Sequence, residues 1–225
     1  MRLIVKCFTK FNQNAIFLHT NHSNIVFNAS GVDLSGSQTG AANIAITANS
    51  GNVNTSNATV ATSGTAGVLG ITAKTNNTQT LDNTQGTLSA VQLNLDIANL
   101  TNTQGQITQT GVGDTSIVLT SPTGTLNNTG GTLTVNSANF EIAANTLTNT
   151  DGKIQHAGTG ALSITADTLS SVRGQVVSNN NIALTIGTQL NNTQGSVYAH
   201  TDLTLTSTGS ITNTGFIAAQ GNATL

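Results

Sequence analysis

The sequence predicts an all-β protein that winds as a parallel β-helix, and three observations support this prediction. A short motif, Leu-x-Asn-Thr-x-Gly, returns at nearly regular intervals. Apolar residues alternate with polar ones between its copies, and Asn, Thr, Ser, Gly and Ala dominate the surface composition. A fixed period of roughly 20 to 50 residues is typical of repeat proteins such as solenoids. An apolar spacing of two favours strands over helices.

The motif sets the length of one coil. Successive copies are separated by 19, 26, 21, 22, 21 and 21 positions. Units of about 20 residues are too short for propeller blades, which need about 40, but they fit one coil of a β-helix. Strands of neighbouring coils then lie about 4.8 Å apart. Seven copies occur, the fifth of them degenerate, and they begin at Leu81, Leu100, Leu126, Leu147, Leu169, Leu190 and Ile211.

Each coil has three parts. The motif forms a turn, a short strand such as Thr132–Val135 follows, and a longer strand such as Ile182–Ile186 completes the coil. In both strands the apolar residues are two apart, so we expect them to point inward and to stack along the axis. The spacing of 26 residues predicts a surface loop, at Gly111–Asp114 or at Ser121–Gly124.

The Asn and Gly of the motif are the candidate site residues, and their role is structural. We expect the amides to stack from coil to coil as an Asn ladder. Asn also tolerates the left-handed backbone of a sharp turn, and Gly permits the next bend at little steric cost. The predicted ladder is Asn83, Asn102, Asn128, Asn149, Asn192 and Asn213, and the predicted turn glycines are Gly86, Gly105, Gly131, Gly152, Gly174 and Gly195.

The chain divides into three expected regions. Residues 1–22 form a non-repeat leader whose basic start resembles a signal peptide, but Lys6 interrupts its apolar stretch, so we expect a truncated or misassigned start. Residues 23–80 are expected to form irregular coils, and residues 81–225 carry the clear repeats. The last copy stops within an apolar strand at Leu225, which leads us to expect a fragment of a longer protein.

Composition excludes several classes of protein. Charged residues make up 6% of the chain and the net charge is −2, so no basic field is available for nucleic acid or for anionic lipid. The single Cys7 excludes an intrachain disulfide framework and a cysteine metal cluster. A run of about 18 apolar residues is absent, so we expect no transmembrane helix.

Catalytic and metal-binding patterns are weak. His156 and His200 are expected to end equivalent strands two coils apart, about 10 Å from each other, which is too far to share one metal. Among the acids, Glu141 and Asp167 are one coil apart but in shifted register, as solvated side chains on a polar face would be. We therefore expect no enzyme activity, no metal and no cofactor. The remaining histidines and acids are His19, His22, Asp33, Asp82, Asp96, Asp114, Asp151 and Asp202.

The repeated Leu-x-Asn-Thr-x-Gly pattern resembles the haemagglutinin repeats of filamentous haemagglutinin-like adhesins. These are exoproteins of two-partner secretion systems, and contact-dependent growth-inhibition toxins share the repeats. The resemblance covers residues 81–225 well and residues 24–74 weakly. It implies a right-handed parallel β-helix, a secreted or cell-surface location, and export through an outer-membrane two-partner transporter in the full-length protein.

Three functions follow as hypotheses. The first is an adhesive and structural shaft segment, whose partner would be a glycan or protein on a host or neighbouring cell. The second is the delivery stalk of a contact-dependent growth-inhibition toxin. The third is a β-helix enzyme that degrades polysaccharides, which would need Glu141 and Asp167 in one groove with a basic residue.

Overall fold

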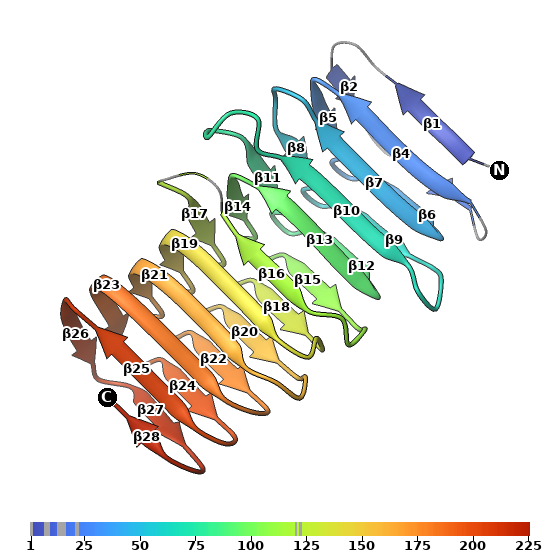
Figure 1. The fold of residues 1–225 in the computed structure, drawn as a ribbon. Coiled ribbons are helices and arrows are strands. Elements are labelled where there is room, and N and C mark those ends of the chain that lie inside the picture. Colours follow the sequence, from blue (N-terminus) through green and yellow to red (C-terminus); the bar gives the residue numbers. More distant parts are fainter. Residues whose placement is uncertain (1, 7–9, 13–16, 21–22, 120, 122) are drawn as a thin grey trace.

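The computed structural model describes residues 2–6, 10–12, 17–20, 23–119, 121 and 123–225. These residues form strands and connections and contain no helix. The strands run parallel in a β-solenoid of about 10 turns with about 21 residues per turn, and Figure 1 shows the coils stacked from the N-terminus to the C-terminus. The prediction of an all-β parallel β-helix is confirmed.

Three faces surround the core. Face 1 begins with a five-stranded sheet and continues through β16 (Thr115–Val118) and the first halves of the long strands that follow it. The five strands are, in spatial order, β1 (Arg2–Lys6), β4 (Asn24–Ala29), β7 (Asn43–Ala48), β10 (Val68–Ala73) and β13 (Gln92–Ile97).

Face 2 belongs to a 13-stranded sheet, which in the C-terminal half of the chain also includes the strands of face 1. This happens because three long strands run continuously from face 1 into face 2; β19, for example, pairs with β16 through its first half and with β17 through its second half. In spatial order the sheet contains β2 (Lys10–Asn12), β5 (Gly31–Asp33), β8 (Val53–Asn54), β11 (Thr80–Asp82), β14 (Asn99–Thr101), β17 (Thr125–Asn127), β19 (Phe140–Thr148), β21 (Leu162–Ser170), β23 (Ile182–Asn192), β25 (Leu203–Ser207) and β28 (Ala223–Thr224), with β16 beside β19 and β26 (Ser210–Asn213) beside β23.

Face 3 is a regular ten-stranded sheet. At about 4.8 Å per strand, its first and last strands lie about 43 Å apart. Its strands are, from the N-terminal end, β3 (Phe17–His19), β6 (Gln38–Ala41), β9 (Thr59–Thr62), β12 (Thr87–Ala90), β15 (Gln106–Gln109), β18 (Thr132–Val135), β20 (Lys153–His156), β22 (Gln175–Ser178), β24 (Ser196–Ala199) and β27 (Phe216–Ala219).

The core is a set of stacked apolar rows. Inward and outward side chains alternate along the strands, as in β18, where Leu133 and Val135 are buried and Thr132 and Thr134 are half-buried. Full burial of one such aliphatic side chain stabilises the fold by about 1.5–3 kcal/mol relative to its exposed state. The motif leucines form one row and are buried at Leu81, Leu100, Leu126, Leu147, Leu169 and Leu190.

The three expected regions share the same sheets. In the leader, β1, β2 and β3 pair with β4, β5 and β6 at separations of 22, 21 and 21 residues. The expected boundary after residue 22 therefore does not coincide with a break in the solenoid. Residues 23–80 add further three-strand coils, and their irregularity lies in connections such as the loop between Ala73 and Thr80.

Both alternatives for the insertion contribute to the spacing of 26 residues. Five residues separate β15 from β16, whereas one separates β12 from β13 in the preceding coil. Six positions separate β16 from β17, whereas the equivalent chain in β19 runs on as one strand. The structure describes Leu119, Ser121, Thr123 and Gly124 of the second loop.

The described residues contain no candidate for a membrane-spanning helix. Within the described residues, none of the secondary structure is a helix of the length and apolarity that a bilayer crossing requires.

Candidate functional site

The predicted Asn ladder is present as a chain of side-chain hydrogen bonds. The Nδ2 atoms of Asn83, Asn102 and Asn128 each donate to Oδ1 of the next Asn along the shaft, at 2.8, 2.7 and 2.8 Å. Asn192 donates to Asn213 in the same way at 2.9 Å. The amides are buried except at Asn213, which is exposed. The bonds between buried amides link neighbouring coils in the interior, where hydrogen bonds are strengthened by the low local dielectric constant.

Every buried ladder amide also satisfies backbone carbonyls. Asn128 Nδ2, for example, donates to Gly131 O in its own coil at 3.1 Å and to Lys153 O in the next coil at 3.2 Å. The same two bonds recur at Asn83 and Asn102. Asn192 makes both bonds as well, whereas Asn149 bonds only the carbonyl of the next coil, so the ladder ties every one of these turns to its neighbour and most of them also to themselves.

Hydroxyl residues replace Asn at two ladder positions. Thr55 Oγ1 donates to Asn83 Oδ1 at 3.0 Å and extends the ladder toward the N-terminus. Ser171 Oγ accepts a bond of 3.3 Å from Asn149 Nδ2, but its short side chain does not continue to Asn192. Asn192 Oδ1 is consequently buried without a hydrogen-bond partner. The degenerate motif copy thus interrupts the ladder.

The expected left-handed conformation of the ladder Asn is wrong. Positive φ angles occur two positions later, at the residue that precedes the motif Gly. Side-chain bonds explain the difference: the ladder Asn is held by its amide contacts, and the tight turn falls on a residue that points to solvent. These left-handed residues are Gln85, Gln104, Gly130, Asp151, Arg173 and Gln194; Gly36 and Asn57 also have a positive φ, in coils without the motif Gly.

The expected reason for the motif glycines is also wrong. None of the six has a positive φ; each lies against a backbone carbonyl of the preceding coil. A Cβ built on Gly131 would lie 2.0 Å from Asn102 O, and one on Gly152 would lie 2.1 Å from Asn128 O. Gly86, Gly105, Gly174 and Gly195 show the same contact at 2.0–2.3 Å. The motif needs Gly because the coils approach too closely for any side chain.

The left-handed residues form an outer row with contacts of its own. Gln85 Nε2 donates to Gln104 Oε1 at 3.0 Å, and Arg173 makes two 2.7 Å bonds to the carboxylate of Asp151. The hydrogen bonds and charge of Arg173 lower the pKa of Asp151, and Asp151 raises the pKa of Arg173. Both side chains are about half exposed, so solvent screens this pair.

A second series of Asx contacts was not predicted. Near the start of face 1 strands, a side-chain oxygen accepts the backbone N–H of the following coil. Examples are Asp114 Oδ1 with Asn139 N at 2.8 Å and Asn181 Oδ1 with Asp202 N at 3.1 Å. The loops before these positions vary in length, so their spacing gives no constant period. Further members are Asn43, Asn139 and Asp202.

The acids Asp96, Glu141 and Asp167 do not lie together in one groove. Asp96 forms a 2.7 Å ion pair with Lys74. Glu141 is paired in register with Ser163 of the next coil, and Asp167 lies four residues beyond Ser163. Four residues at about 3.3 Å each and one strand spacing of about 4.8 Å place the backbones of Glu141 and Asp167 about 14 Å apart, whereas paired carboxylates of glycosidases lie about 5–9.5 Å apart.

The histidines occupy different environments. His156 is buried; its Nε2 lies 2.9 Å from Ser137 O and its Nδ1 lies 3.0 Å from Ser178 Oγ. The register pairs Ser178 with Ala199, so His200 lies one residue beyond the position equivalent to His156, contrary to expectation, and it is exposed. No group of three or more His, Cys, Asp or Glu side chains able to hold a metal occurs among the described residues.

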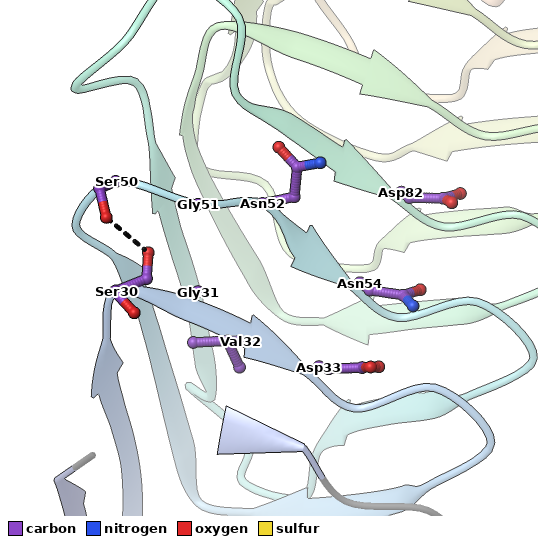
Figure 2. Close-up of a pocket in the computed structure, with 9 residues that line it drawn as sticks. All are labelled: Ser30, Gly31, Val32, Asp33, Ser50, Gly51, Asn52, Asn54 and Asp82. Carbon is purple, nitrogen blue, oxygen red and sulfur yellow. Dashed lines mark hydrogen bonds between the residues drawn. The ribbon is translucent and has the colours of Figure 1, made fainter. Parts of the chain in front are cut away.

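A polar hollow of about 400 Å³ lies on face 2 near the N-terminal end. Figure 2 shows Asp33, Asn54 and Asp82 pointing the same way from neighbouring strands, and the register places them on three successive coils. Gly31 and Gly51 are also among the residues that line it. Each of the three Oδ1 atoms accepts the backbone N–H two residues later, at 3.0–3.1 Å. The hollow therefore offers hydrogen-bonding groups to solvent without a cationic partner in its lining.

Comparisons with known proteins identify one local similarity. The toxin CdiA of Yersinia pestis is 40% identical to this chain over 83 residues, which are 37% of the chain. The same stretch spans 2% of the relative's length. No family model matches the chain. No solved structure matches it.

Proposed function

We propose that this chain is a segment of the β-helical shaft of a surface-exposed or secreted, filamentous haemagglutinin-like adhesin. The single observation that carries this proposal is the coil stack itself, in which a core, a ladder and three faces repeat along one axis. Support also comes from the local similarity to CdiA. In this function the shaft holds other parts of a longer protein away from the cell.

The outer surface suits weak and repeated contacts. Thr, Asn, Ser and Gln side chains line the faces, as in the outward row of Thr108, Thr134 and Gln155 on face 3. We propose a glycan or protein on a host or neighbouring cell as the partner, with affinity gained by multivalency. We assign no catalytic role to Asp96, Glu141 or Asp167, which lie on separate coils. Export would use an outer-membrane two-partner transporter.

A second candidate function is the delivery stalk of a contact-dependent toxin. The observation that favours it is the local similarity to CdiA, a toxin of which the matched stretch spans 2%. A stalk makes the same mechanical demand as an adhesive shaft, namely a rod of fixed length. The two functions differ in what the longer protein carries at its end.

Removal of one whole coil from the full-length protein tests the shaft function. Deletion of residues 153–174 joins Gly152 to Gln175, and because Lys153 and Gln175 are register partners, all three faces stay in phase. The deletion also removes Ser171, so Asn149 would meet Asn192 directly. A shaft should keep its adhesion or toxin delivery within about twofold, since its length falls by only about 4.8 Å.

Two controls give this experiment its meaning. Deletion of residues 153–163 removes half a coil and should abolish folding and export, because the apolar rows then face solvent. If the whole-coil deletion folds and is exported but loses function completely, the segment contains a specific binding site and the shaft proposal fails. Killing of neighbouring cells by the intact protein, without adhesion, would favour the delivery stalk.

A further inference from the structure

The sheet of face 1 is interrupted at one place. Strand β13 pairs with β10 at six positions, and β16 pairs with β19 at four positions, but among the described residues no ladder joins β13 to β16. The same two coils remain paired on the other faces, through β12 with β15 and through β14 with β17. At this place face 1 lacks a backbone ladder between neighbouring coils, whereas faces 2 and 3 have one.

Two glutamine side chains replace the missing ladder. Gln109 is buried, and its Oε1 accepts the N–H of Leu93 at 2.9 Å and the hydroxyl of Thr115. On the outer side, Gln92 Nε2 donates to Leu93 O at 3.2 Å and to Asp114 O at 3.0 Å. The backbone groups of Leu93 on the open edge are therefore bound by side chains from both sides.

Gln109 also fixes the loop that displaces β16. Its Nε2 donates to Gly113 O at 2.6 Å and to Gly111 O at 3.2 Å. This single buried amide thus connects β13, the inserted loop and the first residue of β16. Its loss would leave both strand edges and the loop without their shared partner.

The remaining open edge is exposed in a groove of about 370 Å³. Backbone N–H groups alternate in direction along a parallel strand. Thr115 and Leu119 donate toward β19, so the N–H groups of Ser116 and Val118 point toward β13. The outward side chains of both strands, among them Asn94 and Val118, line the groove.

We propose that this break is a bending joint, at which face 1 opens and closes while faces 2 and 3 stay paired. Gln109 is the positioning residue that holds the closed arrangement. An added strand does not fit between β13 and β16, because pairing on the other faces and the 2.7 Å bond from Asn102 to Asn128 keep the coils one strand spacing apart. The joint divides the shaft into an N-terminal and a C-terminal segment, and it does not depend on the proposed function.

Residue-resolved amide hydrogen exchange on the intact chain tests the joint. In a closed parallel sheet, interior amides open only with large free energies. We expect the amides of Leu95, Ser116 and Val118 to exchange at least tenfold faster than Leu69 and Ile164, which occupy buried positions in continuous parts of the solenoid. Equal protection at all five amides would overturn the proposal.

Comparing the variants Gln109→Leu and Gln79→Leu distinguishes a specific role of Gln109 at the joint from a general destabilisation of the fold. Gln79 is also a buried glutamine beside an inserted loop and bonds Ala48 O and Gly51 O, but the strands near it are continuous. Gln109→Leu should accelerate exchange at Leu95 and Ser116 about tenfold further, and Gln79→Leu should leave them unchanged. If both variants accelerate these amides equally, Gln109 does not hold a joint. If Gln109→Leu fails to fold, the comparison of wild-type amides still decides the question.

Discussion

The interruption of the ladder at Ser171 should be repairable by a single substitution, Ser171→Asn. The backbone at this position matches that of the Asn coils: Ser171 N donates to Asn191 O at 2.7 Å, as Asn128 N does to Thr148 O. An Asn side chain here would have an acceptor ready in the next coil, since Asn192 Oδ1 is buried without a partner.

The expected gain follows from that unpaired oxygen. A buried acceptor without a partner costs about 1–3 kcal/mol, and ordering a longer side chain at residue 171 costs roughly 1 kcal/mol. By analogy with Asn128, the new Nδ2 would also reach the carbonyls of Gly174 and Ser196. The net stabilisation should be about 1–2 kcal/mol, which for a chain of this size corresponds to a rise in Tm of about 3–6 °C.

Urea unfolding and thermal melting of the purified chain, followed by circular dichroism, measure this gain. Ser171→Asp is the matched control, because a carboxylate has the shape of the amide but cannot donate to Asn192, so it should destabilise. Ser171→Ala should also destabilise, since Asn149 Nδ2 loses the hydroxyl that it contacts. An unchanged or lower Tm for Ser171→Asn would refute the claim that the ladder stabilises the shaft.

Three further predictions concern the turn. Gly131→Ala should prevent folding or cost at least about 3 kcal/mol in urea unfolding, since its Cβ would lie 2.0 Å from Asn102 O. Gly130→Gln should change stability by less than about 1 kcal/mol, because this left-handed position meets only Gln104 Cγ at 3.3 Å and carries Gln in other coils. Arg173→Gln should lower the Tm slightly at pH 7. Arg173 lowers the pKa of Asp151 in the folded state, so the Tm difference between wild type and variant should be present above the ordinary pKa of 3.8 and shrink as the pH falls below it. The Tm difference should also shrink in high salt. A Tm difference that grows at low pH would contradict this assignment.

The repeated part of the fold could be predicted because one residue type serves one purpose in every coil. In most coils the motif Leu fills the core and the motif Asn bonds the Asn of the next coil, so the period and the ladder can be read from the sequence. The left-handed position escaped prediction for the opposite reason. It tolerates Gln, Gly, Asp and Arg, and a position that accepts such different residues gives no pattern.

Other features depend on contacts between distant residues. The role of Gln109 depends on the loop before β16 and on the missing ladder between β13 and β16, and no local pattern distinguishes it from other glutamines. The strands of the leader carried a usable signal, since Leu18 and Thr39 are register partners at the same 21-residue separation as the later coils. The charged residues between the leader's apolar segments concealed that period.

The stacking of coils in one continuous register is the central claim, and distances between spin labels on face 3 test it most directly. The outward residues Ser89, Thr108, Thr134, Gln155, Val177, Tyr198 and Ala218 are consecutive register partners. With Cys7 replaced by serine, one label stays at residue 89 and the second moves to residue 155, 177, 198 or 218. The backbone distances should be about 14, 19, 24 and 29 Å, increasing by about 4.8 Å per coil. Distances that do not increase with coil number would contradict the solenoid and the shaft function that rests on it.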